Sequence, residues 1–184
     1  MAVNRLVIDG YGQLEINNCA FRRDGRVEAQ CKPDATAFSS VPVENGMILA
    51  VDAAARIVKP ATDTSLPVAI VYTAEHMYDD RADGLKDFRT NAQNDFLPRL
   101  GYLAVGDKFT TNTICYDTTV YANETALKSA IASAAASAVY GAVSSNGAIA
   151  VQSSAPAAGL KLRVLKGYTM PDGTYGVQFQ VYAD

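Results

Sequence analysis

The stretch YLAVGDKFTTNTICYD, residues 102–117, gathers the side chains of this chain that are best suited to chemistry. Its thiol, hydroxyls and carboxylates come from Asp107, Thr110, Thr111, Thr113, Cys115 and Asp117. A thiol or hydroxyl acts as a nucleophile when a neighbouring base accepts its proton. Histidine is the base used most often, so a nucleophilic site here would need His76, the single histidine of the chain.

The setting of these residues favours a strand over a reactive centre. Gly106-Asp107 predicts a turn, and threonine is typical of strands in a half-exposed sheet. The two faces of that strand would be Phe109, Thr111, Thr113 and Cys115 on one side and Thr110, Asn112, Ile114 and Tyr116 on the other. Cys115 would then lie in mid-strand, away from the helix ends and turns that stabilise a thiolate. The chain has no GxSxG, Walker or dinucleotide motif, so we predict no enzyme, no catalytic residue and no cofactor.

The most polar stretch, Glu75–Asn94, does not have the spacing of a metal site. Asp79 and Asp83 would occupy calcium-loop positions, but Arg81 stands at the third position and Thr90 at the twelfth. A lone histidine is a poor site for a transition metal. We predict no bound metal and interpret the stretch as a long surface loop. Loops of this length are often held by a partner, and the candidate contacts in it are His76, Asp79, Asp80 and Arg81.

Composition narrows the class of protein. The 184 residues are 49% hydrophobic and 19% charged, with a formal net charge of −3 and no block of consecutive Lys or Arg. Direct binding of nucleic acid is not expected, because it needs a clustered positive surface. No apolar run approaches the ~20 residues that span a bilayer, and no secretory signal is recognisable. The sequence therefore predicts synthesis in the cytoplasm, no membrane contact, and three reduced, buried cysteines.

Short strands separated by Gly, Asp and Asn turns dominate the elements that must position these residues. The pattern predicts a mainly β protein with one substantial helix, built as a β-barrel or sandwich core with an extended N-terminal arm. We place the arm and a hairpin in residues 1–45 and a β-rich body in residues 46–184. The body contains an inserted helix at about 123–141, capped by Asn123, and a C-terminal hairpin at 160–182.

A second group of candidate contacts flanks Asp24-Gly25. This pair predicts a two-residue primed turn inside AFRRDGRVEAQC, which would place Arg22, Arg23 and Arg26 at the tip of a hairpin. Two interpretations stay open. The tip is either a solvated turn or an arginine-rich contact for a carboxylate surface on a partner.

Several stretches resemble small virion proteins of tailed bacteriophages. They cover most of the chain: VIDGYGQLEIN, FRRDGRVEAQ, VENGMILAVD, EHMYDDRADGLKDF, FLPRLGYLAVGDKFTTN and YTMPDGTYGVQFQVY. The chain is similar in style to capsid decoration (cement) proteins, which carry an N-terminal arm and a β-rich body. That resemblance implies binding to the outside of an assembled shell, often as an oligomer. The long loop from Glu75 to Asn94 departs from a minimal cement domain.

We therefore expect a virion structural protein that binds and stabilises the assembled head. Its partners would be the major capsid protein or other virion proteins and further copies of itself, and its location the virion. Two alternatives stay open. One is another virion component, such as a tail, connector or fibre-base part. The other is a small ligand-binding or enzymatic β-barrel, which would show a deep apolar pocket with convergent polar groups.

Overall fold

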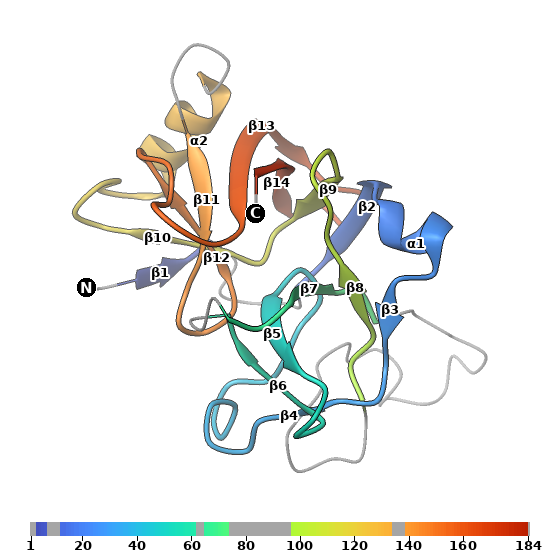
Figure 1. Cartoon of the computed structure of the whole chain (residues 1–184). Coiled ribbons are helices and arrows are strands. Elements are labelled where there is room, and N and C mark those ends of the chain that lie inside the picture. Colours follow the sequence, from blue (N-terminus) through green and yellow to red (C-terminus); the bar gives the residue numbers. More distant parts are fainter. Residues whose placement is uncertain (1–2, 7–11, 62–64, 74–96, 134–138, 184) are drawn as a thin grey trace, which may run out of the picture.

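Two open sheets of mixed strand direction form the protein (Figure 1). The computed structural model describes residues 3–6, 12–61, 65–73, 97–133 and 139–183. The 8-stranded sheet has the order β1 (Val3–Arg5), β10 (Ile114–Asp117), β12 (Ile149–Gln152), β11 (Tyr140–Val143), β13 (Lys161–Thr169), β14 (Tyr175–Ala183), β9 (Lys108–Thr111) and β2 (Leu14–Asn18). The 6-stranded sheet has the order β3 (Val27–Glu28), β8 (Leu100–Tyr102), β7 (Val68–Val71), β5 (Ile48–Asp52), β6 (Ile57–Pro60) and β4 (Lys32–Pro33).

Neither sheet closes on itself. Within the described residues, β1 and β2 end the larger sheet and β3 and β4 end the smaller one, each pairing on one side only. Most pairs are antiparallel, and β10–β12 and β4–β6 are parallel. The barrel alternative is therefore wrong, while the mainly β class is confirmed. The N-terminal residues that were predicted to form an arm supply both edges of the larger sheet through β1 and β2.

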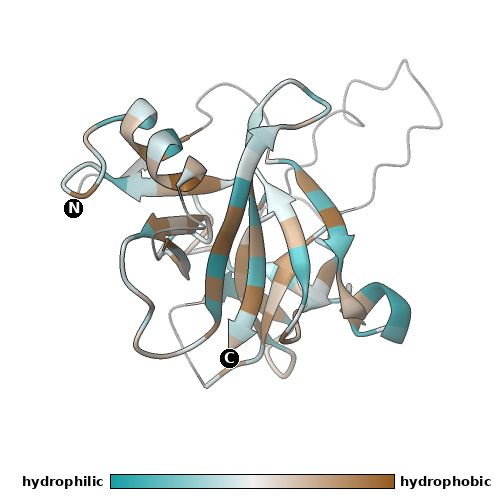
Figure 2. Ribbon diagram, turned by 90° about the horizontal axis from the view of Figure 1, so that it is seen from above, coloured by the Kyte–Doolittle hydropathy of each residue, from teal (hydrophilic) through white to brown (hydrophobic). Residues whose placement is uncertain are grey.

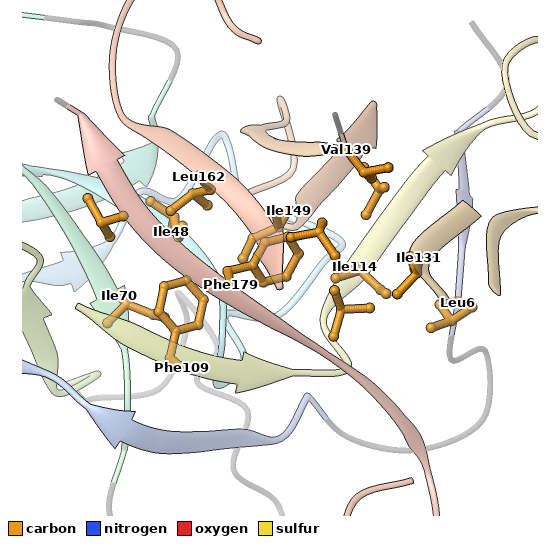
Figure 3. Packing of buried hydrophobic residues seen from close by; sticks show 14 of the residues in the cluster. Leu6, Ile48, Ile70, Phe109, Ile114, Ile131, Val139, Ile149, Leu162 and Phe179 are labelled. Carbon is orange, nitrogen blue, oxygen red and sulfur yellow. The ribbon is translucent and has the colours of Figure 1, made fainter. Parts of the chain in front are cut away.

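A shared core joins the two sheets. Ile48 and Ile70 of the smaller sheet belong to the same buried cluster as Phe109 and Phe179 of the larger one (Figure 3). The ring centroids of Phe109 and Phe179 are 5.8 Å apart, within the range in which aromatic pairs attract. Burial of these side chains supplies the main force that holds the sheets together.

The smaller sheet buries its other face as well. Leu49, Val51, Ala69 and Val71 pack there with Phe38 and Val43 from the segment that precedes β5. The sequence predicts a central strand with two apolar faces at residues 68–72, and β7 is confirmed in this role between β5 and β8. Since both faces are covered, the central strands β5 and β7 have continuous apolar runs in their sequences, ILAV and VAIV.

The C-terminal hairpin is confirmed. β13 and β14 pair antiparallel along their length, with Leu162, Val177 and Phe179 turned into the core. The turn between them is closed by the Met170 amide, which donates to the Thr174 carbonyl at 2.8 Å. Figure 2 shows the banded hydropathy that this alternation produces along the strands. Local pattern and turn chemistry agree here, so the element forms as predicted.

The inserted helix is shorter than predicted. Helix α2 (Glu124–Ala132) begins at Asn123, whose side chain accepts from the Ala126 amide at 2.9 Å, as expected for an N-cap. Leu127 and Ile131 are buried. The prediction that the helix runs to residue 141 is wrong, because Tyr140–Val143 forms β11 and pairs with β12 and β13. The strand contains Gly141, a poor helix former, and its pairing with two neighbouring strands outweighs the helical preference of the alanines.

A short helix replaces the hairpin predicted around Asp24-Gly25. Helix α1 (Ala20–Asp24) ends at Gly25, which adopts a left-handed conformation with φ of 68° and donates its amide to the Phe21 carbonyl. Glycine favours this conformation at helix ends, so the signal taken for a hairpin turn is a helix cap. The chain then enters β3, which pairs with β8.

Candidate functional site

The threonine run holds the fold together instead of presenting nucleophiles. Thr110, Thr111, Asn112 and Thr113 are all fully buried, so the expectation of a half-exposed sheet is wrong. The run also breaks into β9 and β10 at Asn112-Thr113, with Asp107 following the predicted Gly106 turn. The break exchanges the two faces, and Phe109 and Ile114 therefore lie in one core although strict alternation puts them on opposite sides.

Each buried hydroxyl of the run has a partner. Thr111 Oγ1 donates to the Gln13 carbonyl at 2.6 Å, and Thr113 Oγ1 donates to the Asn45 carbonyl at 2.6 Å. Thr110 Oγ1 donates to Asn17 Oδ1 at 2.8 Å. Satisfied polar groups of this kind fix the position of the segments they join. The run thus ties the start of β2 and the turn before β5 to the larger sheet.

All three cysteines are buried. Cys115 is 1% exposed within β10, and Cys19 and Cys31 are also buried, with no disulfide. Burial raises the pKa of the Cys19 thiol to about 12, and the charge of Asp107 is the second cause of this rise. A thiol in this setting stays protonated at neutral pH.

The three predicted contact arginines separate onto different surfaces. Arg22 lines a groove between the two sheets, while Arg26 lines a second hollow of about 290 Å³. Arg23 is largely exposed and pairs with Asp24 at 2.9 Å. The other predicted contacts, His76, Asp79, Asp80 and Arg81, lie outside the described residues. Arg22 thus lines a groove together with a second arginine, Arg99.

The groove that contains Arg22 has a volume of about 420 Å³. We call it the edge groove, because it lies beside β2 and β3, the strands that end the two sheets on this side. In Figure 1 the link between these strands is α1, and Figure 2 shows α1 as mostly hydrophilic. The described residues that line it are Gln13, Leu14, Ile16, Arg22, Val27, Asn45, Tyr72, Thr73 and Arg99.

Aromatic and backbone contacts position the walls of the edge groove. Phe21, next to Arg22, is fully buried, and its ring centroid is 4.8 Å from that of Tyr72. The Tyr72 amide donates to the Arg99 carbonyl at 2.9 Å, which brings these two residues together across the sheet. The Thr73 amide donates to Asn45 Oδ1 at 2.7 Å. Four segments that are far apart in the sequence therefore meet here: helix α1, the loop with Asn45, the residues after β7 and the residue before β8.

The described lining of the edge groove contains two positively charged side chains, Arg22 and Arg99. Burial raises the pKa of the Tyr72 hydroxyl, and the charges of Arg99 and Arg22 oppose that rise. Both guanidinium groups are therefore close enough to the Tyr72 hydroxyl to affect its pKa. The Thr73 hydroxyl is buried and has no hydrogen-bond partner among the described residues. A buried polar group without a partner is costly.

Sequence reasoning found Arg22 and missed the rest of the site. Arg99, Tyr72 and Thr73 carry no motif, and their grouping depends on the pairing of β7 with β8. The nearest signals in the sequence are the strand-like segments on either side of Arg22, which give β2 and β3. Neither of them reveals the distant residues that complete the groove.

No family model matches the chain, and neither a curated protein nor a solved structure matches it. In the part of the chain that the structure describes, no group of three or more His, Cys, Asp or Glu side chains is placed to hold a metal ion. Neither α1 nor α2 has the length and apolar character of a membrane-crossing helix.

Proposed function

We propose that this chain is a structural protein of a tailed-phage virion that binds and stabilises the assembled head, as capsid decoration proteins do. The sequence resemblance supports this class of protein. The edge groove carries the proposal, because its described lining combines two arginines with the apolar residues Leu14, Ile16 and Val27 beside an edge strand of each sheet. Edge strands and arginines are common elements of surfaces that bind other proteins.

Rigidity supports a stabilising role. The buried hydroxyls of Thr111 and Thr113 tie Gln13 and Asn45, two residues of the groove, to the larger sheet. A groove whose walls are fixed before binding loses little conformational entropy when a partner docks. The free energy gained from contacts with the shell is then not offset by the cost of ordering the groove, and it stabilises the assembly.

Many copies of a decoration protein bind one shell, so each single contact can be weak and the shell is still stabilised. A protein that binds the assembled state and not the free subunits stabilises the assembly by mass action. Self-association on the shell would add avidity, since linked sites bind together more tightly than single ones. The partners would accordingly be the major capsid protein or another virion protein, together with further copies of this chain. The virion would be its location, with the polar stretch containing His76, Asp79, Asp80 and Arg81 as an additional contact.

A mixing assay tests the proposal. The purified protein is added to mature capsids that lack it, and co-sedimentation is measured together with the capsid melting temperature. We expect saturable binding and a higher melting temperature. Absence of both effects would rule out a decoration role. Binding to isolated tails in place of heads would assign the protein to the tail, connector or fibre base.

A further inference from the structure

The edge groove concentrates positive charge on an acidic protein. The chain has 16 Lys and Arg against 19 Asp and Glu. The described lining of the edge groove nevertheless contains two arginines and no carboxylate. Arg22 and Arg99 are both exposed, and within the described residues neither forms an ion pair. The local charge therefore complements a negatively charged ligand.

The chemistry of the lining favours carboxylates. A guanidinium group bonds a carboxylate through two parallel hydrogen bonds, and the described lining of the edge groove has two such groups, from Arg22 and Arg99. Nucleic acid would require a longer row of cations along its backbone. The lining also contains Leu14, Ile16 and Val27. These side chains suit the apolar parts of a polypeptide.

The two strands beside the edge groove favour an extended ligand. β2 and β3 each pair on one side only within the described residues. The free edge of a strand presents unpaired amides and carbonyls, to which an extended peptide can add as a further strand. A ligand of this shape uses both the backbone groups of an edge and the arginines beside it.

We propose that the edge groove binds an extended, carboxylate-bearing segment of a partner protein. This inference rests on the proposed function, in which that segment belongs to the shell protein. It names the chemistry of the contact: Arg22 and Arg99 hold carboxylates, and the β2 or β3 edge holds the backbone.

A nuclear magnetic resonance titration with a short poly-L-glutamate peptide tests the chemistry of the edge groove. We expect amide shifts at Gln13–Ile16, Tyr72, Thr73 and Arg99, which weaken as salt is added. The double variant Arg22→Gln/Arg99→Gln is expected to bind at least about tenfold more weakly. Arg23→Gln is the matched control, because Arg23 lies on the same helix but outside the groove. It should bind as the unmodified protein does.

Titrations with other anions distinguish a carboxylate-bearing peptide from a small anion and from nucleic acid as the ligand of the edge groove. Free glutamate at the same total carboxylate concentration should give much weaker shifts, since it lacks a strand backbone. Equal shifts from free glutamate would overturn the extended segment in favour of a small anion. If the groove bound an oligothymidylate in preference to the peptide, the proposal that its ligand carries carboxylates would be wrong. Unchanged peptide binding by the double variant, or shifts confined to another surface, would overturn the groove.

The same variants in the capsid assay separate this inference from the proposed function. If the unmodified protein binds capsids and the double variant binds about tenfold more weakly, with Arg23→Gln unaffected, both stand. If the double variant binds capsids as well as the unmodified protein does, the inference fails and the function stands. If no form binds capsids, the proposed function fails, and so does the assignment of the bound segment to a shell protein. The peptide titration then still tests whether the edge groove binds carboxylates. Thermal unfolding of each variant confirms that it is folded.

Discussion

The carboxylate of Asp107 fastens the first residue of helix α1: Asp107 Oδ1 accepts the Ala20 amide at 2.8 Å. Its other oxygen accepts the Ala104 amide at 2.9 Å. Asp107 is 4% exposed, and it follows the Gly106 turn that leads into β9. One side chain thus links the turn before β9 to the helix that carries Arg22 into the edge groove.

Replacing this carboxylate should weaken both the fold and the groove. Asp107→Ala leaves two amides without their acceptor, and we expect the free energy of unfolding to fall by about 2–4 kcal/mol. Denaturant unfolding measures the change. Asp172→Ala is the matched control, since Asp172 accepts the Thr174 amide at 3.0 Å in an exposed turn. It should cost less than about 1 kcal/mol. Equal losses in the two variants would contradict the role given to Asp107.

A close contact between Gly101 and Phe21 sets the position of α1. A Cβ atom at Gly101 would lie 2.5 Å from three atoms of the Phe21 ring. Gly101→Ala should therefore displace the ring and lower the free energy of unfolding by about 1–3 kcal/mol. A double-mutant cycle with Phe21→Ala measures the coupling. We expect the double variant to lose less stability than the sum of the single variants, because the smaller side chain relieves the clash. Strict additivity would show that the two residues do not interact in this way.

Local signals predicted the elements whose contacts are local. The β13–β14 hairpin follows from alternation and from a turn of three residues, and the start of α2 follows from Asn123. The wrong predictions depend on distant partners. Residues 140–143 form a strand because β12 and β13 are beside them. Gly25 caps a helix because Phe21 is buried under Gly101 and Asp107 holds Ala20.

The candidate site was predictable only in part for the same reason. Arg22 attracted attention because it stands near a turn and close to two other arginines. The structure separates these three and places Arg99, from a remote segment, in the same groove as Arg22. The threonines were predicted to lie in a half-exposed strand, because a sequence does not show burial. Once buried and bonded to backbone carbonyls, their hydroxyls serve the fold.

The Cys19 thiol should make stability fall in alkaline solution. Its pKa is raised from 9.0 to about 12, first by burial and then by the charge of Asp107. The unfolded chain loses this proton near its ordinary pKa, whereas the folded protein keeps it. The contribution is therefore complete below about pH 9 and is lost progressively as the pH rises towards 12. Urea unfolding of the unmodified protein and of Cys19→Ala, at neutral pH and at about pH 10, measures it. The variant should lose less stability between these two conditions, and an identical loss would refute the assignment.

The hydroxyl of Thr113 joins the break between β9 and β10 to a wall of the edge groove. It donates to the Asn45 carbonyl at 2.6 Å, and the Asn45 side chain in turn accepts the Thr73 amide. Thr113→Val keeps the shape but leaves that buried carbonyl without its donor, so the free energy of unfolding should fall by about 1–3 kcal/mol. The amide resonances of Asn45 and Thr73 should shift, and binding of the glutamate peptide should weaken because the groove wall is no longer fixed. Thr119→Val, which removes an exposed hydroxyl bonded to Asp117, should change neither stability nor binding appreciably. A Thr113 variant that loses stability but binds the peptide unchanged would separate the buried network from the edge groove.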